Sequence, residues 1–145
     1  MSLLDQKTLA EGLERIGEEA IAQHNDAALD DYFADGFVFH GPDRDATLDD
    51  LKQLWAGMRA AFTGFAVTRD AILIQGNMAA ARTRMAGTFE HEYAYSPIGT
   101  VQPTGRPVSF QIINFFRYDD EGRLAEEWAQ MDNLGLLRQL GVDVP

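Results

Sequence analysis

Residues 126–141, EEWAQMDNLGLLRQLG, join a half-polar strand to a leucine-rich helical turn that is closed by a glycine. Alternation along a strand gives this segment two faces, with Ala125, Glu127 and Ala129 on one and Leu124, Glu126, Trp128 and Gln130 on the other. Each face therefore carries one carboxylate. Two interpretations stay open at this point: a solvated strand before a structural turn, or a strand that brings a carboxylate into a pocket.

Three segments upstream also alternate and are rich in β-branched or aromatic residues, as strands are. They are FAVTRDAILI (65–74), NMAAARTRMAGTFEHEYAY (77–95) and PVSFQIINFFRY (107–118), and they precede GRLAEEWAQM (122–131). Gly76 with Asn77, and DDEG at 119–122, are typical of hairpin turns. Segment 96–106 is rich in Pro, Gly and Thr, so we expect it to form the longest loop. The order predicts an antiparallel meander.

The first half of the chain predicts helices instead. Apolar residues at steps of three and four indicate an amphipathic helix over 7–24 and a shorter one over 28–33. GFVFHGP at 36–42 is expected to be a short strand that ends at His40. Thr47 and Asp50 resemble a capping box, which begins a third helix that we expect to run to Gly64.

Helices followed by a meander indicate an α+β fold. We predict a single domain over 1–145, a cone-shaped barrel made of a curved antiparallel sheet whose inner face is covered by the N-terminal helices. A chain of 145 residues can bury a sizeable core. A cone of this kind is open at its wide end, where a concave and mostly apolar ligand site is expected.

Composition limits the partners and the compartment. The formal net charge of −11 repels phosphate backbones and anionic membranes, so we expect neither nucleic acid nor a membrane as partner. The chain has no cysteine, its first residues lack the pattern of a signal peptide, and no run approaches the roughly 18 apolar residues of a membrane span. These features favour a cytoplasmic protein without disulfides.

Three segments resemble one known family: FVFHGP at 37–42, PTGRPV at 103–108 and EGRLAEEWAQMDNLGLLRQLG at 121–141. They are similar to the SnoaL-like polyketide cyclases and ester cyclases of the nuclear transport factor 2-like superfamily. The resemblance implies a cone-shaped α+β barrel, a homodimer formed through the outer face of the sheet, and an internal cavity for a small hydrophobic molecule. It also implies acid–base chemistry without a metal or an organic cofactor.

The sequence departs from this family at one decisive position. Many relatives have a catalytic aspartate directly after the tryptophan of the last strand, and this chain has Ala129 there. The family's second aspartate is present as Asp132, for which capping the following helical turn is a sufficient reason. Family register turns Glu127 toward the cavity, so Glu127 is our candidate acid or base on this strand. The alternative is a solvated glutamate at the mouth of the barrel.

Two further polar residues are candidate catalytic groups. Asn114 is the lone amide on an otherwise apolar strand face, where it could hold a carbonyl or enolate oxygen of a ligand or simply bond to a neighbouring backbone group or water. His40 ends an apolar strand and could carry protons, or could instead cap the loop that follows. Histidine spacing gives no metal-site motif and the chain has neither a P-loop nor a G-x-G-x-x-G, so we expect no metal and no nucleotide, and the resemblance implies no organic cofactor.

Apolar positions around these groups are candidate substrate contacts. They are Trp55, Met58, Phe62, Ile112, Phe116 and Ala129. Ordinary core packing is the alternative for the three residues of the third helix, Trp55, Met58 and Phe62. Arg82 and Arg84 are expected on a solvated or dimer-facing strand face, whereas an arginine turned inward would favour an anionic ligand.

The predicted function is cofactor-independent acid–base catalysis on a small hydrophobic molecule that bears a carbonyl or hydroxyl group. Glu127 and His40 would carry protons during proton abstraction next to a carbonyl, followed by aldol-type cyclisation or isomerisation. An alternative is a non-catalytic binding protein for a hydrophobic metabolite, because Ala129 replaces the family's aspartate. A dimeric scaffold that binds a protein through its outer sheet is a third hypothesis.

Overall fold

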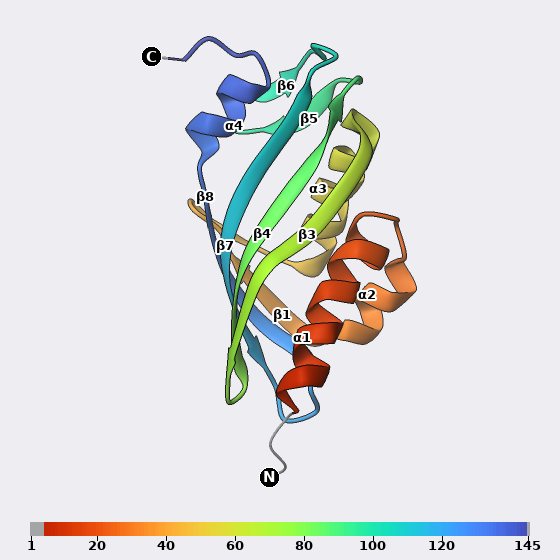
Figure 1. The fold of residues 1–145 in the computed structure, drawn as a ribbon, viewed down its shortest axis with the longest axis vertical. Helices are drawn as coiled ribbons and strands as arrows, with labels where there is room; N and C mark the ends of the chain where they lie inside the picture. Colours follow the sequence, from red (N-terminus) through yellow and green to blue (C-terminus); the bar gives the residue numbers. More distant parts are fainter. Residues whose placement is uncertain (1–4, 145) are drawn as a thin grey trace.

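A computed structural model describes residues 5–144, in which helices cover one face of a curved sheet (Figure 1). The helices are α1 (Gln6–Arg15), the π-helical η1 (Ile16–Ile21), α2 (Asp26–Tyr32), α3 (Leu48–Ala61) and α4 (Asn133–Gln139). The strands are β1 (Phe33–His40), β2 (Asp45–Ala46), β3 (Phe62–Gln75), β4 (Met78–Phe89), β5 (Tyr93–Ser96), β6 (Gly99–Val101), β7 (Pro107–Tyr118) and β8 (Leu124–Met131). The predicted α+β class is confirmed.

The main sheet has six strands in the order β2-β1-β8-β7-β4-β3. Antiparallel pairing joins β3 to β4, β4 to β7, and β7 to β8, as the sequence predicts. The expectation of a wholly antiparallel sheet is wrong at the other side, because β1 pairs with β8 in parallel. The sheet is therefore mixed. Pairing with β1 also covers the edge that β8 would otherwise expose.

The prediction of one continuous strand over 77–95 is wrong, because the strand is shorter. It breaks after Phe89, and its last residues, from Tyr93, form β5, which pairs with β6 of the segment expected to be a loop as a separate two-stranded sheet. The ring of Tyr95 lies where a side chain on Gly57 would have to stand, so the missing Cβ at Gly57 lets β5 pack on α3. Backbone bonds between Phe89 and the residues Gly105 and Arg106 close the loop.

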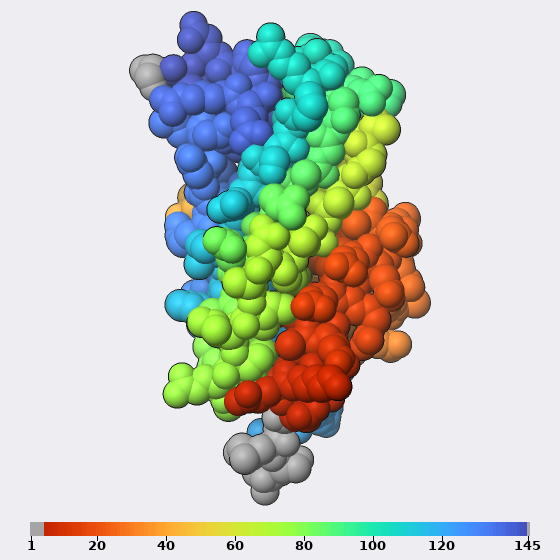
Figure 2. Space-filling view, viewed as in Figure 1, coloured from red at the N-terminus to blue at the C-terminus, as the bar shows by residue number. Residues whose placement is uncertain are grey.

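The N-terminal helices lie along β3 and close one side of the molecule (Figure 2). Asp5 caps α1 by accepting a bond from the Thr8 amide. The expected helix over 7–24 ends earlier and widens into η1, which buries Ile16 and Ile21. A Cβ on Gly17 would stand 3.1 Å from Val67 Cγ1, so glycine lets this turn approach the sheet closely.

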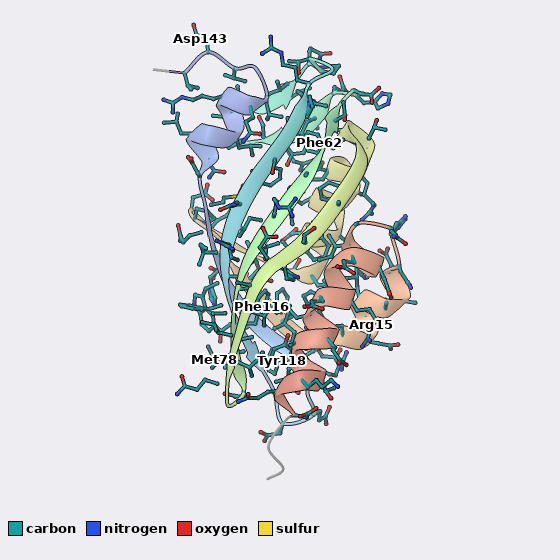
Figure 3. All side chains as sticks on the ribbon, in the orientation of Figure 1. Arg15, Phe62, Met78, Phe116, Tyr118 and Asp143 are labelled. Atoms are coloured by element: carbon teal, nitrogen blue, oxygen red, sulfur yellow. The ribbon has the colours of Figure 1, made fainter. Side chains whose placement is uncertain are left out.

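The third helix confirms the predicted capping box, in which Thr47 and Asp50 satisfy each other's backbone amides. It ends at Ala61, three residues earlier than expected, because the backbone is already extended at Phe62. Phe62 therefore belongs to β3 and packs against Phe89 and Tyr93. Figure 3 shows Phe62 toward the opposite end of the sheet from Phe116 and Tyr118.

The C-terminal turn has the structural role expected for its aspartate. Asp132 caps α4, and its Oδ1 accepts a bond of 2.9 Å from the Gly135 amide. Leu136, Leu137 and Leu140 are buried, which ties this short helix to the core. Among residues 5–144, no helix is long and apolar enough to cross a membrane.

Candidate active site

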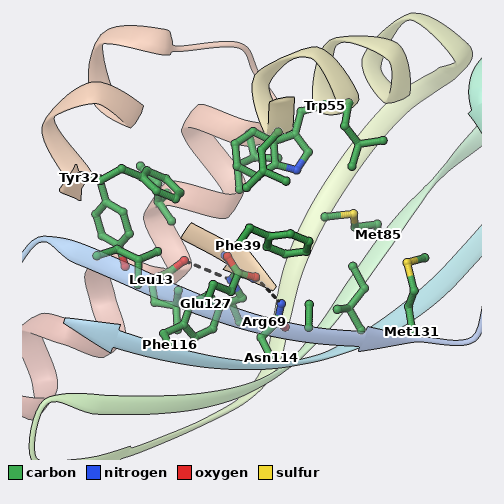
Figure 4. Close-up of a pocket in the computed structure, with 18 of the residues that line it drawn as sticks. Leu13, Tyr32, Phe39, Trp55, Arg69, Met85, Asn114, Phe116, Glu127 and Met131 are labelled. Carbon is green, nitrogen blue, oxygen red and sulfur yellow. Dashed lines mark hydrogen bonds between the residues drawn. The ribbon is translucent and has the colours of Figure 1, made fainter. Parts of the chain in front are cut away.

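A cavity lies between the helices and the inner face of the main sheet (Figure 4). Its volume is about 80 Å³. On this scale a buried water needs roughly 10–15 Å³, so the cavity has room for several water-sized groups. Of the candidate residues, the structure brings these together in its wall: Trp55, Met58, Ile112, Asn114, Phe116, Glu127 and Ala129.

The wall of the cavity is more exposed on one side. Pro42 is exposed and Phe39, Leu54 and Met131 are partly exposed, although all four line the cavity. They come from the region after β1, from β1 itself, from α3 and from the end of β8. At the other end the walls are fully buried, as at Leu13 and Leu124. A ligand would therefore enter between β1, α3 and the end of β8.

Glu127 is the buried carboxyl of this cavity, with 7% of its surface exposed. Its Oε2 accepts a hydrogen bond of 2.9 Å from Asn114 Nδ2 (Figure 4). Burial raises the pKa of Glu127 to about 7, against the lowering influence of the Arg69 charge and the Asn114 bond. A carboxyl with this pKa can both accept and return a proton near neutral pH.

A chain of hydrogen bonds holds Asn114 in place. The Thr83 hydroxyl donates to Asn114 Oδ1 at 2.7 Å, and Arg69 Nη1 donates to the same hydroxyl oxygen at 2.8 Å. Thr83 and Asn114 are buried on the inner faces of β4 and β7. The structure thus favours the interpretation of Asn114 as an amide bonded within the protein. Its bond to Glu127 fixes the carboxyl's orientation.

Arg69 is a cavity residue that the sequence interpretation missed. It lies on the inner face of β3 opposite Thr83, its Nε donates to the Leu13 carbonyl at 3.3 Å, and its guanidinium carbon lies 5.4 Å from the centre of the Phe116 ring. Burial lowers the pKa of Arg69, while the Glu127 charge opposes this shift. The signal was present, because alternation places Arg69 on the same strand face as buried Val67.

Tyr32 completes the polar lining of the cavity and is paired with Tyr118. The hydroxyl groups of Tyr32, from α2, and Tyr118, from β7, are hydrogen-bonded to each other, and Tyr32 lines the cavity. Burial raises the pKa of both phenols, that of Tyr118 to about 12, so both are neutral at physiological pH. One bond uses one of the two hydroxyl hydrogens. The other hydrogen can be donated elsewhere.

The register of β8 puts Glu127 and Ala129 on the same face, opposite Phe116 and Asn114 of β7. Ala129 is buried in the cavity wall, at the position where the resemblance implies a catalytic aspartate. Leu124 departs from simple alternation and also lines the cavity. The pairing of β7 with β8 shifts register between Arg117 and Tyr118, and this bulge turns Leu124 inward.

His40 is not at the cavity. It pairs with Trp128 across β1 and β8, so its ring lies on the outer face, stacked on the Trp128 ring at 5.3 Å. Its Nε2 lies 2.6 Å from Glu126 and its Nδ1 lies 2.9 Å from Asp45. These two bonds, of which that with Glu126 has the larger effect, raise the pKa of His40.

Phe62, the other candidate outside the cavity wall, packs against Phe89 and Tyr93 instead.

The outer face carries Arg82 and Arg84, which the sequence assigned to a solvated or dimer-facing strand face. Arg82 is exposed there, and Arg84 forms an ion pair with Asp70 whose closest distance is 3.1 Å. The sequence therefore placed Arg82 and Arg84 correctly on the outer face but did not identify Arg69, the arginine that points inward. Within the described part of the chain, no three His, Asp or Glu side chains are placed to hold a metal ion.

Comparison with known proteins identifies the family to which a chain with this geometry is similar. The family model of the SnoaL-like polyketide cyclases matches residues 13–140. No curated protein matches the chain. AclR from Streptomyces galilaeus, a candidate hydroxylase, is 26% identical over 96% of this chain and 83% of its own, with a TM-score of 0.75.

Two further solved structures resemble this one. IdmH from Streptomyces antibioticus, a candidate polyketide cyclase, is 29% identical over 95% of this chain and 100% of its own, with a TM-score of 0.72. A protein from Catenulispora acidiphila with a ketosteroid isomerase-like fold is 14% identical over 94% of this chain and 97% of its own, with a TM-score of 0.66. At that identity the likeness concerns the fold alone.

Proposed function

Because this chain belongs to the SnoaL-like polyketide cyclase family, we propose that it is a cofactor-independent enzyme that removes a proton next to a carbonyl group. The observation that supports this most is Glu127, a buried carboxyl in an apolar cavity whose pKa is raised to about 7. Ionised Glu127 takes the proton, and the protonated carboxyl then returns it to another carbon or oxygen of the same molecule. Cyclisation and isomerisation both follow from this step.

The other polar residues have supporting roles in this proposal. Asn114 is a positioning residue, since its amide joins Glu127 to Thr83. Arg69 supplies a positive charge to the same cavity. His40 is left out of the reaction, because its ring lies on the outer face of the sheet. The resulting site contains one carboxyl as proton carrier.

The ligand is expected to be small and mostly apolar, with at least one carbonyl or hydroxyl group. Trp55, Met58, Ile112 and Phe116 form aromatic and aliphatic walls, and the volume of about 80 Å³ admits only a compact molecule or one part of a larger one. Entry of a larger substrate would require the partly exposed side chains at the mouth, such as Phe39 and Leu54, to move apart.

The reaction can be tested without knowing the natural substrate. In D₂O, a base that removes a proton next to a carbonyl replaces it with deuterium, and NMR of the bicyclic ketone 2-tetralone measures the rate. The protein should accelerate this exchange, and Glu127→Gln should lower the acceleration by a factor of roughly 100 or more. Glu126→Gln on the opposite face is the matched control. Equal rates for the wild type and Glu127→Gln would contradict the proposal.

A second candidate function is binding of a hydrophobic metabolite without catalysis. It is favoured by Ala129, which lines the cavity where many relatives have the catalytic aspartate. This hypothesis predicts that 2-tetralone binds, seen as perturbed NMR signals of cavity residues, while its exchange rate stays at the uncatalysed level. The two measurements on the same sample separate an enzyme from a binding protein.

We also propose that two copies associate through the outer face of the main sheet, in a cytoplasmic protein. That face exposes large apolar side chains, namely Leu73, Ile113, Phe115 and Trp128. Leu73, on the edge strand β3, is 75% exposed and Phe115, on the inner strand β7, is 55% exposed, and a contiguous apolar patch of this kind marks an interaction surface. Phe115→Glu should shift the molar mass measured by light scattering from two chains to one. An unchanged mass would contradict this interface.

A further inference from the structure

Two polar atoms that share the cavity have no bonding partner among the described residues. Arg69 uses Nε and Nη1 for bonds to the Leu13 carbonyl and the Thr83 hydroxyl, and Glu127 uses Oε2 for its bond from Asn114. Nη2 of Arg69 and Oε1 of Glu127 make no hydrogen bond within residues 5–144. No fully buried side-chain nitrogen or oxygen atom of residues 5–144 lacks a partner, so Nη2 and Oε1 both keep some accessible surface, and both residues line the cavity.

The two charges are close enough to interact but are not an ion pair. The Arg69 charge lowers the pKa of Glu127, yet no nitrogen of Arg69 lies within 4.0 Å of a carboxylate oxygen in the described chain. Both partners of the guanidinium are neutral oxygen atoms. Arg69 is partly buried, and a cation removed in part from water and bonded only to neutral groups favours an anion in its vicinity.

Resting on the proposed function, we infer that the cavity is selective for organic acids, which bind as anions next to Arg69 while Glu127 holds a proton. The cavity would then contain one negative charge at a time, either on Glu127 or on an oxygen of the ligand. The ligand class is a compact apolar molecule with a carboxylate, or with an enol or phenol that loses its proton easily. A 1,3-dicarbonyl compound belongs to this class through its enol form.

Proton balance links this preference to the proposed reaction. When a carbon acid enters beside ionised Glu127, the proton moves from the ligand carbon to the Glu127 oxygen, and the electron pair of the C–H bond becomes the enolate. The negative charge has moved from Glu127 to the ligand, and Arg69 faces one anion before and after. A ligand that arrives already ionised must instead bind together with a proton.

Few other groups can titrate near this charge pair. Glu127 on β8, Tyr32 on α2 and Tyr118 on β7 are the ionisable groups whose charges act on Arg69. Burial raises the pKa of both tyrosines, so they stay neutral. Since Arg69 is always charged at physiological pH, Glu127 is the group whose protonation would control anion binding.

Benzoate and its neutral counterpart benzamide test the inference by titration calorimetry at about pH 6 and about pH 8, on either side of the Glu127 pKa. Benzoate should bind more tightly than benzamide at the lower pH, and its affinity should fall by about tenfold at the higher pH. Benzamide affinity should not follow this trend. In Glu127→Gln, benzoate should bind with the same affinity at both pH values.

Arg69→Met should weaken benzoate binding by roughly 30-fold or more, and Arg69→Lys should restore part of it. Arg84→Met on the outer face is the matched control and should bind like the wild type. If Arg69→Met does not fold, the pH comparison between wild type and Glu127→Gln decides alone. Benzamide binding at least as tight as benzoate binding would overturn the inference while leaving the proposed function intact. Absence of binding by both probes would also overturn the inference, and the 2-tetralone exchange rate then decides the proposed function separately.

Discussion

Glu126 and Glu127 are neighbours in the sequence and lie in opposite environments. Glu126, on the outer face of β8, is bonded to His40 and Arg117, and these partners, first His40, lower its pKa. Glu127, on the inner face, is bonded to a neutral amide, and burial raises its pKa to about 7. The same side chain is therefore held as an anion on one face, whereas on the other it is the carboxyl that carries a proton in the proposed function.

The comparison shows that the partners on each face decide what the carboxyl can do. An imidazole and a guanidinium within hydrogen-bond distance stabilise the ionised form, whereas apolar walls and an amide leave the cost of burying a charge largely uncompensated. The arginines repeat the contrast. Arg84 outside has Asp70 as its ion-pair partner, while Arg69 inside bonds only to neutral oxygen atoms.

The largest expected effect concerns stability as a function of pH. The folded pKa of Glu127, about 7, exceeds its ordinary value of 4.5, so the folded state holds this proton more tightly than the unfolded chain does. The resulting stability is fully present below pH 4.5 and is lost as the pH rises to about 7, a change of roughly 3 kcal/mol in the free energy of unfolding.

Urea unfolding at a series of pH values measures this loss. Glu127→Gln should remove it and become more stable than the wild type above about pH 7, because the amide cannot ionise. Glu126→Gln should keep the wild-type decline between the two pKa values. A decline that persists unchanged in Glu127→Gln would show that another group is responsible.

Thr83→Val tests the hydrogen bonds that orient the inner carboxyl. The valine fills the same space but leaves Asn114 Oδ1 and Arg69 Nη1 without a partner, at a cost of roughly 1–3 kcal/mol in the free energy of unfolding. Thr68→Val, on a partly exposed position of the neighbouring strand, is the control and should change stability far less. Equal effects of the two substitutions would contradict a structural role for this chain of bonds.

Ala129→Asp tests the inner face by adding the family's missing carboxyl. Two carboxyls in one cavity cannot both ionise freely, so one of their apparent pKa values should rise by about one pH unit or more above that of Glu127 alone. The pH dependence of 2-tetralone exchange reports this shift, and a faster exchange at its optimum would mean that the rest of the site still supports the family's reaction. An unchanged profile would place residue 129 outside the site.

The smallest effect is expected from the outer face. His40→Ala removes a ring that bonds to Glu126 and Asp45 and stacks on Trp128, all outside the cavity. The exchange rate and its pH dependence should therefore stay at wild-type values. A large loss of exchange activity in a folded His40→Ala protein would mean that the two faces of β8 act together.

Much of this contrast could be predicted from alternation along the strands. Alternation along β8, combined with the family register, places Glu127 and Ala129 on the cavity side. Asn114 could be identified because it is the only amide on the apolar face of β7. His40 was misassigned because the end of an apolar strand does not specify a face. Only the pairing of His40 with Trp128, made between strands far apart in the sequence, settles that its ring points outward.

Other features depend on contacts that local patterns do not contain. The parallel pairing of β1 with β8 and the inward turn of Leu124 come from long-range registry and from a bulge. Phe62 looked helical because the apolar stripe of α3 continues into β3 without a break in composition. Alternation along β3 places Arg69 on the inner face, but charged residues are seldom buried, so Arg69 was expected at the surface.

Titration of the two glutamate carboxyl groups tests the central claim most directly. With side-chain ¹³C labelling, NMR follows each carboxyl carbon across the pH range, and Glu126→Gln and Glu127→Gln assign the two signals. Glu127 should titrate at about 7, while Glu126 should titrate below its ordinary value of 4.5. Titration of both carboxyls together near that ordinary value would contradict a buried proton carrier in this cavity.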